Sequence, residues 1–399
     1  MESILLLGTS ISQLPAINDS LQSGLRVGAV GNYESHLDLI ENEKFTFHQI
    51  KLNDFDKIYS LARKYDAVTT IASDFTLSLL YKLHLEGINT IGLPEPASLI
   101  PILTNKKKFR ERMSYAGLYT PPFEIIDGTK SNFASHINLK FPLIVKPLDS
   151  SGSKGVSKCS DIQTLDLSVA KALAFSNSEF IIVEQCIVKT NNQVCGDGVI
   201  INGKVKFFGH GRGITYDNSF IPLAEQFPYP NNMIIDETIR QVEYIAKKLK
   251  IKFMLFNVDA IPYEKGVFIC ELTPRLGGNY LYKAIEECYG INLFKYALHM
   301  SQNDQNEYDY TRYQAKKFVL TGMIHKSAQS RKLTENQKDI FKNLQISSLI
   351  PLEKDTAFEN YELKSKTYGN MIFSSKDPLF FDFLMTFCPD NFEIDNAIF

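Results

Sequence analysis

The segment 253–278 constrains this chain more than any other part of its sequence. It consists of two apolar runs on either side of Glu264-Lys265-Gly266, a pattern that predicts a β-hairpin. If the turn is centred on Lys265, Asp259 and Glu271 lie opposite each other on one face. Two carboxylates that face each other on apolar strands destabilise a hairpin unless something neutralises them.

A divalent cation is the neutralising group that we favour for this hairpin. Mg²⁺ prefers carboxylate oxygens, and phosphate oxygens can complete its octahedral shell. Asn257 would share the face with the carboxylates, because side chains alternate along a strand. Two alternatives stay open: a register slip that separates Asp259 from Glu271, or a lysine or arginine that pairs with one of them.

The charge balance excludes a polyanion as the main partner. The 399 residues include 43 Lys and Arg against 45 Asp and Glu, so no global positive field exists to attract nucleic acid. At roughly 150 residues per domain, the length corresponds to two or three domains. Apolar residues make up 44% of the chain, which is enough for a sizeable core. We therefore expect a folded α/β enzyme with no nucleic-acid partner.

The cysteines and the apolar runs favour a cytoplasmic protein. The six cysteines lack CxxC spacing, which is typical of reduced thiols and not of a zinc site or a disulfide framework. They are Cys159, Cys186, Cys195, Cys270, Cys288 and Cys388. Residues 4–7 are a short apolar run with no basic region before it, so we predict a buried strand and no signal peptide. No apolar run approaches the ~20 residues of a membrane span, so we expect no membrane partner.

The first hundred residues alternate short apolar runs with amphipathic stretches, which predicts βαβ units on a parallel sheet. Gly8-Thr9-Ser10 follows the first run but lacks the GxGxxG spacing of a dinucleotide site. The predicted strands are 4–7, 27–30, 45–50 and 67–72, and the predicted helices are 54–64 and 76–86. Prolines near residue 100 and the patterns beyond them divide the chain into the segments 1–100, 101–190, 191–300 and 301–399.

Residues 143–156 place an apolar strand, which ends in Lys146, before a loop of small residues. Gly152 and Gly155 allow backbone N–H groups to approach an anion, while serine hydroxyls and Lys154 add donors and positive charge. The order of residues differs from a Walker A loop, GxxxxGK[ST]. The loop is therefore either a phosphate cradle or a flexible hairpin turn.

Three further stretches carry candidate binding residues. The apolar strand 180–183 ends in Glu184, which could contact a purine edge, although a strand end that meets solvent explains it better. Arg275 follows the hairpin, where a guanidinium could neutralise charge on a phosphorylated intermediate; a salt bridge is the alternative. His210 and Arg212 lie beside glycines and could reach a substrate or a phosphate, with a structural histidine as the alternative.

Taken in order, these stretches resemble the ATP-grasp superfamily of carboxylate–amine ligases. The resemblance covers roughly residues 1–300, and Asn105-Lys106 before a predicted helix and Val145-Lys146-Pro147 belong to it. It implies an α/β fold with α+β catalytic lobes. The implied parts are an N-terminal Rossmann-like domain (1–100), a linking and lid subdomain (101–190), a catalytic lobe (191–300) and a small C-terminal α+β domain (301–399).

The resemblance also implies roles for individual residues. Lys106 and Lys146 resemble the two nucleotide lysines, the loop 150–155 resembles the one that closes over the β- and γ-phosphates, and the segment 184–187 resembles the adenine hinge. The implied ATP-binding residues are Lys106, Lys146, Ser150, Ser151, Gly152, Ser153, Gly155, Glu184, Gln185, Ile187 and Gln193. The implied metal ligands are Asp259, Glu271 and Thr273, and the implied catalytic residues are Arg275, Lys154 and Arg212.

Two positions depart from the pattern of the family. Thr273 stands where the family has Asn, which affects a contact to magnesium or phosphate. Gln193 stands where members often carry an acid that binds ribose, and glutamine can still hydrogen-bond a ribose hydroxyl.

The activity implied by the resemblance is a two-step ligation that uses ATP and Mg²⁺, or Mn²⁺ in its place. A small carboxylate such as an amino acid becomes an acylphosphate, and an amine then displaces the phosphate to form an amide. Positioning and electrostatics carry such phosphoryl transfers, so no protein nucleophile is needed. The family also implies a homodimer. The alternatives are a carboxylase-type member that uses bicarbonate, and a nucleotide-binding regulator without turnover.

Overall fold

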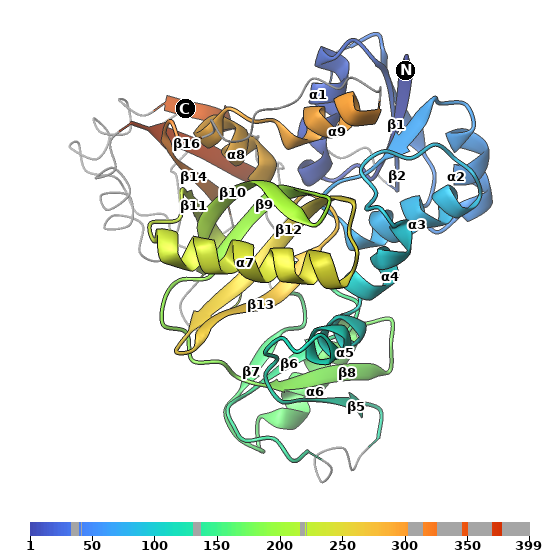
Figure 1. Cartoon of the computed structure of the whole chain (residues 1–399). Coiled ribbons are helices and arrows are strands. Elements are labelled where there is room, and N and C mark those ends of the chain that lie inside the picture. Colours follow the sequence, from blue (N-terminus) through green and yellow to red (C-terminus); the bar gives the residue numbers. More distant parts are fainter. Residues whose placement is uncertain are drawn as a thin grey trace, which may run out of the picture.

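The computed structural model describes residues 1–32, 40, 42–130, 137–215, 220, 222–301, 314–324, 345–349 and 369–376. These residues form a parallel four-stranded sheet, an antiparallel four-stranded sheet and an antiparallel eight-stranded sheet, with helices packed on them. In Figure 1 the large sheet lies in the middle, the N-terminal sheet lies to its upper right, and the small sheet lies below it.

The N-terminal sheet is parallel, as its alternating sequence predicts. Its strands are β1 (Ser3–Leu7), β2 (Arg26–Gly31), β3 (Phe45–Gln49) and β4 (Ala67–Thr69), in the order β3-β2-β1-β4. β1 is buried along its whole length, because a central parallel strand with both faces covered needs apolar residues throughout. β4 is shorter than predicted: Ala72 adopts a left-handed φ of 64°, and its N–H donates to the Leu276 carbonyl in the large lobe described below.

Two of the helices on this sheet agree with the predicted ranges. They are α2 (Phe55–Ala62) and α3 (Asp74–Leu85). Their N-caps, Asp54 and Ser73, each accept a hydrogen bond from a backbone N–H three residues later, which satisfies a donor that the helix leaves unpaired.

Helix α1 (Leu14–Gln22), which follows the short 3₁₀ turn Ile11–Gln13, is not predicted by the sequence. Its centre contains Asn18, Asp19 and Ser20, which compete with helix by bonding the backbone in turns. Asp19 is instead buried, and its carboxylate accepts hydrogen bonds from Tyr282 and Asn292 at 3.0 and 2.8 Å. Contacts distant in sequence therefore stabilise this helix.

The small antiparallel sheet has the order β5-β8-β6-β7, and we call it, with its helix, the small lobe. Its strands are β5 (Phe123–Asp127), β6 (Leu143–Pro147), β7 (Ser157–Cys159) and β8 (Phe180–Gln185). Helix α6 (Leu165–Ala174) packs on the sheet through Leu165 and Val169. The predicted loop of small residues connects β6 to β7, which are hydrogen-bonded neighbours.

Helix α5 (Lys106–Tyr115) lies between the small lobe and the large sheet and follows α4 (Ile100–Leu103). Asn105 caps α5 by accepting from the Lys108 N–H at 3.1 Å. Phe109 is buried in the core of the large lobe, whereas Arg110 pairs with β8 of the small lobe.

The large lobe is the eight-stranded sheet with its helices. Its strand order is β13-β12-β9-β10-β11-β14-β16-β15. The strands are β9 (Val194–Ile201), β10 (Lys204–Thr215), β11 (Pro222–Phe227), β12 (Phe253–Tyr263), β13 (Gly266–Thr273), β14 (Phe318–Ile324), β15 (Gln345–Leu349) and β16 (Gly369–Ser375). In the described part of 301–399, β14 pairs with β11, so this part continues the sheet of the large lobe. A separate C-terminal domain stays a prediction.

Helices cover both faces of the large sheet. Helix α7 (Asn232–Lys248) packs on the face that carries Ile200 and Met254, and helix α8 (Leu281–Tyr289) packs on the face of Val199 and Leu255. Helix α9 (Leu293–Ser301) follows α8 and lies beside α1 of the N-terminal domain (Figure 1). One core cluster therefore joins the N-terminal domain to the α8 face of the large lobe.

Two findings concern the predicted location of the protein. The described cysteines, Cys159, Cys186, Cys195, Cys270 and Cys288, are free thiols. Cys388 lies outside the described residues. Among the helices of the described residues, none has both the length and the apolar character that a bilayer span requires.

Candidate active site

A cavity of about 390 Å³ lies between the small lobe, the α8 face of the large lobe and the edge of the N-terminal domain. The N-terminal domain contributes Ser12 and Ala72 to its wall. Most of the predicted site residues line this cavity. They are Lys106, Lys146, Ser150, Ser151, Gly152, Ser153, Lys154, Glu184, Gln185, Ile187, Gln193, Asp259, Glu271 and Arg275.

Asp259 and Glu271 pair across β12 and β13, as the hairpin prediction requires. The predicted turn centre is wrong, because Tyr263 pairs with Gly266 and the turn is therefore the two residues between them. A regular register from that turn would place Asp259 opposite Cys270. A β-bulge takes up one residue and restores the alignment of the carboxylates.

The two opposed carboxylates differ in their surroundings. Burial and the neighbouring Glu271 raise the pKa of Asp259 to about 6. Burial also acts to raise the pKa of Glu271, but the Lys106 ammonium, 3.0 Å from its Oε1, outweighs that effect and lowers the pKa. Asp259 accepts a hydrogen bond of 2.8 Å from the Gln193 amide. The Glu271 carboxylate is thus neutralised by a lysine, whereas Asp259 takes up a proton more readily than an ordinary aspartate does.

This pair fits a magnesium ion. Mg²⁺ is commonly held by one or two carboxylates together with phosphate oxygens and waters, so a larger protein cage is not required. In keeping with this, the described residues contain no group of three or more His, Cys, Asp or Glu that could enclose a metal on their own. A cation beside Asp259 would offset the burial and the repulsion from Glu271 that raise the pKa of its carboxyl group.

Lys146 and Arg110 share the carboxylate of Glu184. Arg110 Nε donates to Glu184 Oε2 at 3.0 Å, and Lys146 Nζ donates to Oε1. Burial acts to raise the pKa of Glu184, but the two cations outweigh it and lower the pKa to about 2. The sequence identified Glu184 as a strand end that could contact a purine. In this structure its carboxylate instead fixes Lys146, and the next three residues, Gln185, Cys186 and Ile187, line the cavity.

The loop 150–155 forms one side of the cavity. Gly152 and Gly155 have φ of 67° and 73°, which are left-handed values that glycine adopts readily. Lys106 Nζ donates to the Ser150 carbonyl at 2.6 Å and so joins the loop to helix α5. Lys154 is exposed and lines the cavity, whereas Gly155 is buried and does not.

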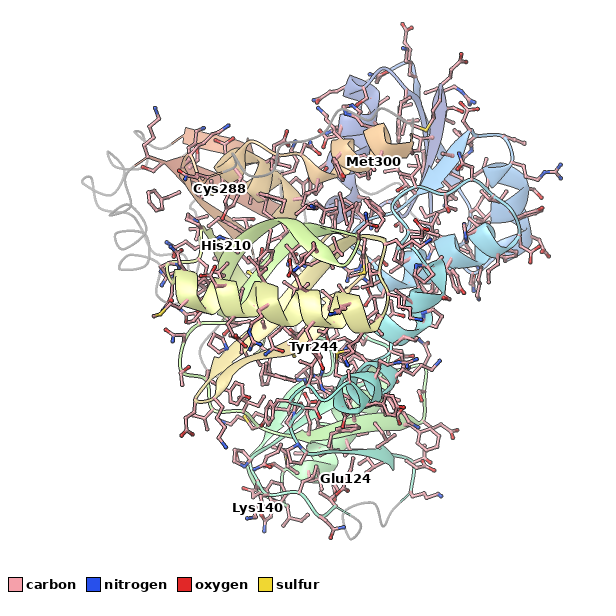
Figure 2. The ribbon with its side chains drawn as sticks, in the orientation of Figure 1. Glu124, Lys140, His210, Tyr244, Cys288 and Met300 are labelled. Atoms are coloured by element: carbon pink, nitrogen blue, oxygen red, sulfur yellow. The ribbon has the colours of Figure 1, made fainter. Side chains whose placement is uncertain are left out.

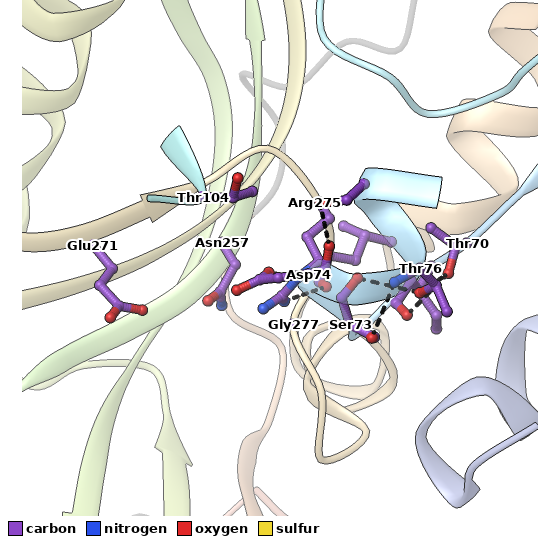
Figure 3. Close-up of polar contacts among 12 residues, drawn as sticks. Thr70, Ser73, Asp74, Thr76, Thr104, Asn257, Glu271, Arg275 and Gly277 are labelled. Atoms are coloured by element: carbon purple, nitrogen blue, oxygen red, sulfur yellow. Dashed lines mark hydrogen bonds and ion pairs between the residues drawn. The ribbon is translucent and has the colours of Figure 1, made fainter. Parts of the chain in front are cut away.

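Arg275 reaches the cavity from the segment after β13, and a residue of the N-terminal domain holds it there. Its Nε donates to Asp74 Oδ1 at 2.7 Å, at the start of α3, and its Nη1 donates to the Leu276 carbonyl at 3.0 Å. Figure 3 shows this pair beside Ser73, which caps α3. Arg275 therefore forms a salt bridge, which was the alternative interpretation, and it also lines the cavity.

Asp197 on β9 lies behind the cavity wall, and the sequence analysis did not identify it. It is fully buried, its Oδ1 accepts from Asn257 Nδ2 at 3.0 Å, and its carboxylate accepts from the Gly277 N–H at 2.9 Å. Burial raises the pKa of Asp197 to about 7 despite these bonds. Asp197 thereby fixes the segment that carries Arg275. No local motif marks it, because its partners lie 60 and 80 residues away.

Glu225 on β11 is the second residue that the sequence analysis missed. It lines the cavity, and its Oε2 is buried without a hydrogen-bond partner. Burial, with Asp259 and Asp197 nearby, raises its pKa well above the ordinary value. A single glutamate in a strand with no recognisable motif does not indicate a binding residue, so the position of Glu225 at the cavity is known only from the fold.

The structure places three predicted residues away from the cavity wall. Arg212 donates from Nε to the Gln226 side chain, Thr273 is buried beside Asn257, and Gly155 packs against Phe175 and Pro147. None of the three is among the lining residues of the described cavity.

His210, labelled in Figure 2, has a structural role, which was the alternative to a contact with a substrate or a phosphate. Its Nδ1 accepts from the Tyr229 N–H at 3.2 Å, and its ring packs against Phe208 and Tyr289.

Comparison with known proteins gives one family match. The family model described as D-ala D-ala ligase C-terminus matches residues 113–252. This range runs from the end of α5 through the small lobe to the start of β12.

A curated relative matches the chain over part of its length. The large chain of carbamoyl phosphate synthase from Clostridium beijerinckii is 22% identical over 246 residues, which is 60% of this chain. The chain spans only 22% of the length of that relative.

Two solved structures match nearly the whole chain. The L-amino acid ligase from Bacillus licheniformis superposes with a TM-score of 0.76 at 17% identity, covering 97% of this chain and 96% of that one. The biotin carboxylase domain dimer of the Hydrogenobacter thermophilus 2-oxoglutarate carboxylase, in complex with MgADP, ADP and bicarbonate, superposes with a TM-score of 0.69 at 16% identity. It covers 94% of this chain and 86% of that one. These likenesses concern the fold.

Proposed function

This chain is a protein of the ATP-grasp fold, and from that premise we propose that it is an ATP-dependent ligase. The reaction that we propose activates a small carboxylate, such as an amino acid, as an acylphosphate and transfers the acyl group to an amine. The observation that carries the proposal is the gathering of charged groups in one cavity. Lys106, Lys146 and Arg275, which we call its cationic side, line it together with the opposed Asp259 and Glu271.

ATP would lie between the lobes with its phosphates toward this cationic side. Lys106 and Lys146 offset phosphate charge, and the loop 150–155 supplies backbone N–H groups and serine hydroxyls. Asp259 and Glu271 would hold Mg²⁺, which stabilises negative charge on the phosphates when bound. Gln185 and Ile187, which line the cavity, would contact the base. The site residues thus agree with a bound MgADP of the kind present in the biotin carboxylase domain.

The chemical steps need positioning and charge compensation, and they need no protein nucleophile. A carboxylate oxygen of the substrate attacks the γ-phosphorus, and the bond from that phosphorus to the bridging oxygen breaks to release ADP. The amine nitrogen then attacks the acyl carbon, the bond to phosphate breaks, and the amine proton passes to solvent or phosphate. Arg275, held by Asp74, stabilises negative charge on the acylphosphate and on the tetrahedral species.

The test is ADP release across a panel of carboxylate and amine pairs, with bicarbonate as one of the acids. We expect Lys146→Met and Glu271→Ala to lower turnover by about 100-fold or more, because the first removes a positive charge beside the phosphates and the second removes a proposed ligand of Mg²⁺. Two matched controls are Lys158→Met, an exposed lysine on β7, and Glu264→Ala, an exposed residue in the turn of the same hairpin. Both controls should retain full turnover.

The panel also separates the proposed reaction from its rivals. Turnover that survives both site substitutions would place the reaction elsewhere. ADP release with bicarbonate as the only acid would identify a carboxylase-type reaction. Nucleotide binding without ADP release for any pair would identify a regulator.

A further inference from the structure

Among the described residues that line the cavity, Glu225 alone has a buried oxygen without a hydrogen-bond partner. Among the described residues, three buried side-chain atoms lack a hydrogen-bond partner: Arg110 Nη1, Tyr280 Oη and Glu225 Oε2. Only Glu225 lines the cavity. A buried acceptor without a donor is costly, so such groups in folded proteins call for an explanation.

The other charged groups on the cavity wall, apart from the exposed Lys154 and Lys189, have partners within the protein. Lys106 pairs with Glu271, Lys146 with Glu184, and Arg275 with Asp74. Asp259 accepts from Gln193. The protein therefore satisfies its phosphate-side charges internally, but it leaves a carboxylate oxygen of Glu225 without a donor.

The register of the sheet explains why Glu225 faces the cavity. Glu225 pairs with Gly213 on β10 and with Thr321 on β14, so these three residues share a face of the sheet. A Cβ at Gly213 would meet nothing closer than 4.0 Å. Cys195 on β9 pairs with both Gly211 and Asp259, which places Asp259 on the same face. The absence of a side chain at Gly213 leaves space between Glu225 and the metal-binding hairpin.

The electrostatics of this space favour a cation. Asp259 and Asp197 both raise the pKa of Glu225, beyond the effect of its burial. A positive group that enters beside Glu225 would relieve this repulsion and supply the missing donor. A primary ammonium brings three N–H donors and one charge, and the carboxyl group can turn to present either oxygen.

We propose that Glu225 binds the protonated amino group of the acid that is activated, so that this acid is an amino acid. The inference rests on the proposed function, because that function supplies the other group of the substrate, the carboxylate that is activated. The amine that attacks the acylphosphate must be unprotonated, so a carboxylate that holds an ammonium would impede it. An ammonium on the activated acid, by contrast, stays protonated throughout and cannot attack its own acyl group.

The experiment compares amino acids with acids that lack only the amino group. The probes are L-alanine with propionate, L-leucine with 4-methylpentanoate, and L-glutamate with glutarate, each bound to the full chain with a non-hydrolysable ATP analogue and Mg²⁺. Calorimetry measures affinity, so the result does not depend on turnover. In the wild type we expect at least one amino acid to bind about 10- to 100-fold more tightly than its partner, as for a hydrogen bond between charged groups.

The variants assign that preference to Glu225. Glu225→Gln keeps the shape of the side chain but removes the charge, and it should reduce the preference to within about 3-fold, with unchanged affinity for the acids without an amino group. Glu225→Asp keeps the charge and should retain part of the preference. Glu264→Gln, in the exposed turn, should retain all of it. The thermal midpoint of Glu225→Gln should not fall, because an unpaired buried carboxylate is replaced by a neutral amide.

The outcomes distinguish this inference from the proposed function. A wild type without any preference, or a preference that Glu225→Gln leaves intact, would overturn the inference even if ADP release supports a ligase. A preference that is lost in Glu225→Gln, in a protein that never releases ADP, would support the ammonium site and contradict the ligase.

Discussion

At the scale of single residues, His210 makes the stability of the fold sensitive to pH. Burial lowers the pKa of His210 from 6.5 to about 4, and its unprotonated Nδ1 accepts from the Tyr229 N–H. Between these two pH values the unfolded chain binds a proton that the folded chain does not, so stability falls as pH decreases. We expect a loss of up to about 3 kcal/mol in the free energy of unfolding between pH 6.5 and 4 from this residue alone.

The check is urea unfolding of wild type and His210→Asn at several pH values in that window. Asparagine offers an oxygen near the position of Nδ1 but does not titrate, so the variant should lose this part of the pH dependence. His84→Asn, which changes an exposed histidine, should keep it. A slope against pH that is equal in wild type and His210→Asn would show that His210 is protonated in the folded protein.

The sequence predicts a residue of this site well where a local rule applies. Asp259 and Glu271 are close in sequence, and alternation along two strands of one hairpin brings them together. Glu184 was identified as well, but not its role, because Arg110 lies 74 residues away and no local rule connects them. No local pattern identifies Glu225 or Asp197, since the role of a carboxylate in a strand depends on its neighbours in the sheet, which are distant in sequence.

At the scale of elements, the loop 150–155 is the part that we expect to respond to nucleotide. Gly152 has a left-handed φ of 67°, and a Cβ there would meet nothing within 4 Å. Gly152→Ala therefore adds a conformational cost of about 1 kcal/mol without a clash. We expect the loop to keep this conformation when nucleotide binds and to relax without it, so that the cost appears as a KM for ATP about 5-fold higher.

Gly24→Ala is the matched control for this loop. Gly24 has a φ of 82° and equally open surroundings, but its N–H donates to Leu21 in a turn of the N-terminal domain. The same backbone cost should there lower the free energy of unfolding and leave the KM for ATP unchanged. Equal KM values for the two variants would show that the loop does not reorder around the nucleotide.

The elements themselves were predictable to different degrees. The parallel strands and helices α2 and α3 follow from apolar periodicity, which survives in any tertiary context. Helix α1 does not, because it depends on the burial of Asp19 against α8 and the residues after it. The bulge between β12 and β13 was also unforeseen, since nothing in the sequence distinguishes Cys270 from a paired strand residue.

At the scale of the whole molecule, the N-terminal domain takes part in the site through Asp74. Arg275 Nε lies 2.7 Å from Asp74 Oδ1, and 201 residues separate the two in sequence. Asp74→Asn keeps an acceptor but removes the charge that orients Arg275. We expect kcat to fall about 10-fold with the KM for ATP unchanged, because Arg275 compensates charge after ATP has bound.

Asp56→Asn is the control for that variant. Asp56 lies in the first turn of α2 in the same domain, so its replacement has a similar effect on a helix N-terminus. Its kcat should stay within 2-fold of wild type in a steady-state assay of ADP release. If the KM for ATP rose in Asp74→Asn and kcat did not change, Arg275 would act in nucleotide binding instead of in the chemical steps.

Helix α5 has a consequence for how the two lobes can move. Lys106 binds Glu271 of the large lobe and the Ser150 carbonyl of the small lobe, and one turn later Arg110 binds Glu184 of the small lobe and stacks over Phe268 of the large lobe. Sliding the lobes apart by more than about 1 Å would break these hydrogen bonds, which weaken steeply with distance. Because Lys106 and Arg110 each have a partner in both lobes, a movement that widens the cavity between the lobes must break at least one of these contacts. The separation of the two lobes is therefore coupled to the ion pairs of the phosphate-facing wall, and α5 is the element that couples them.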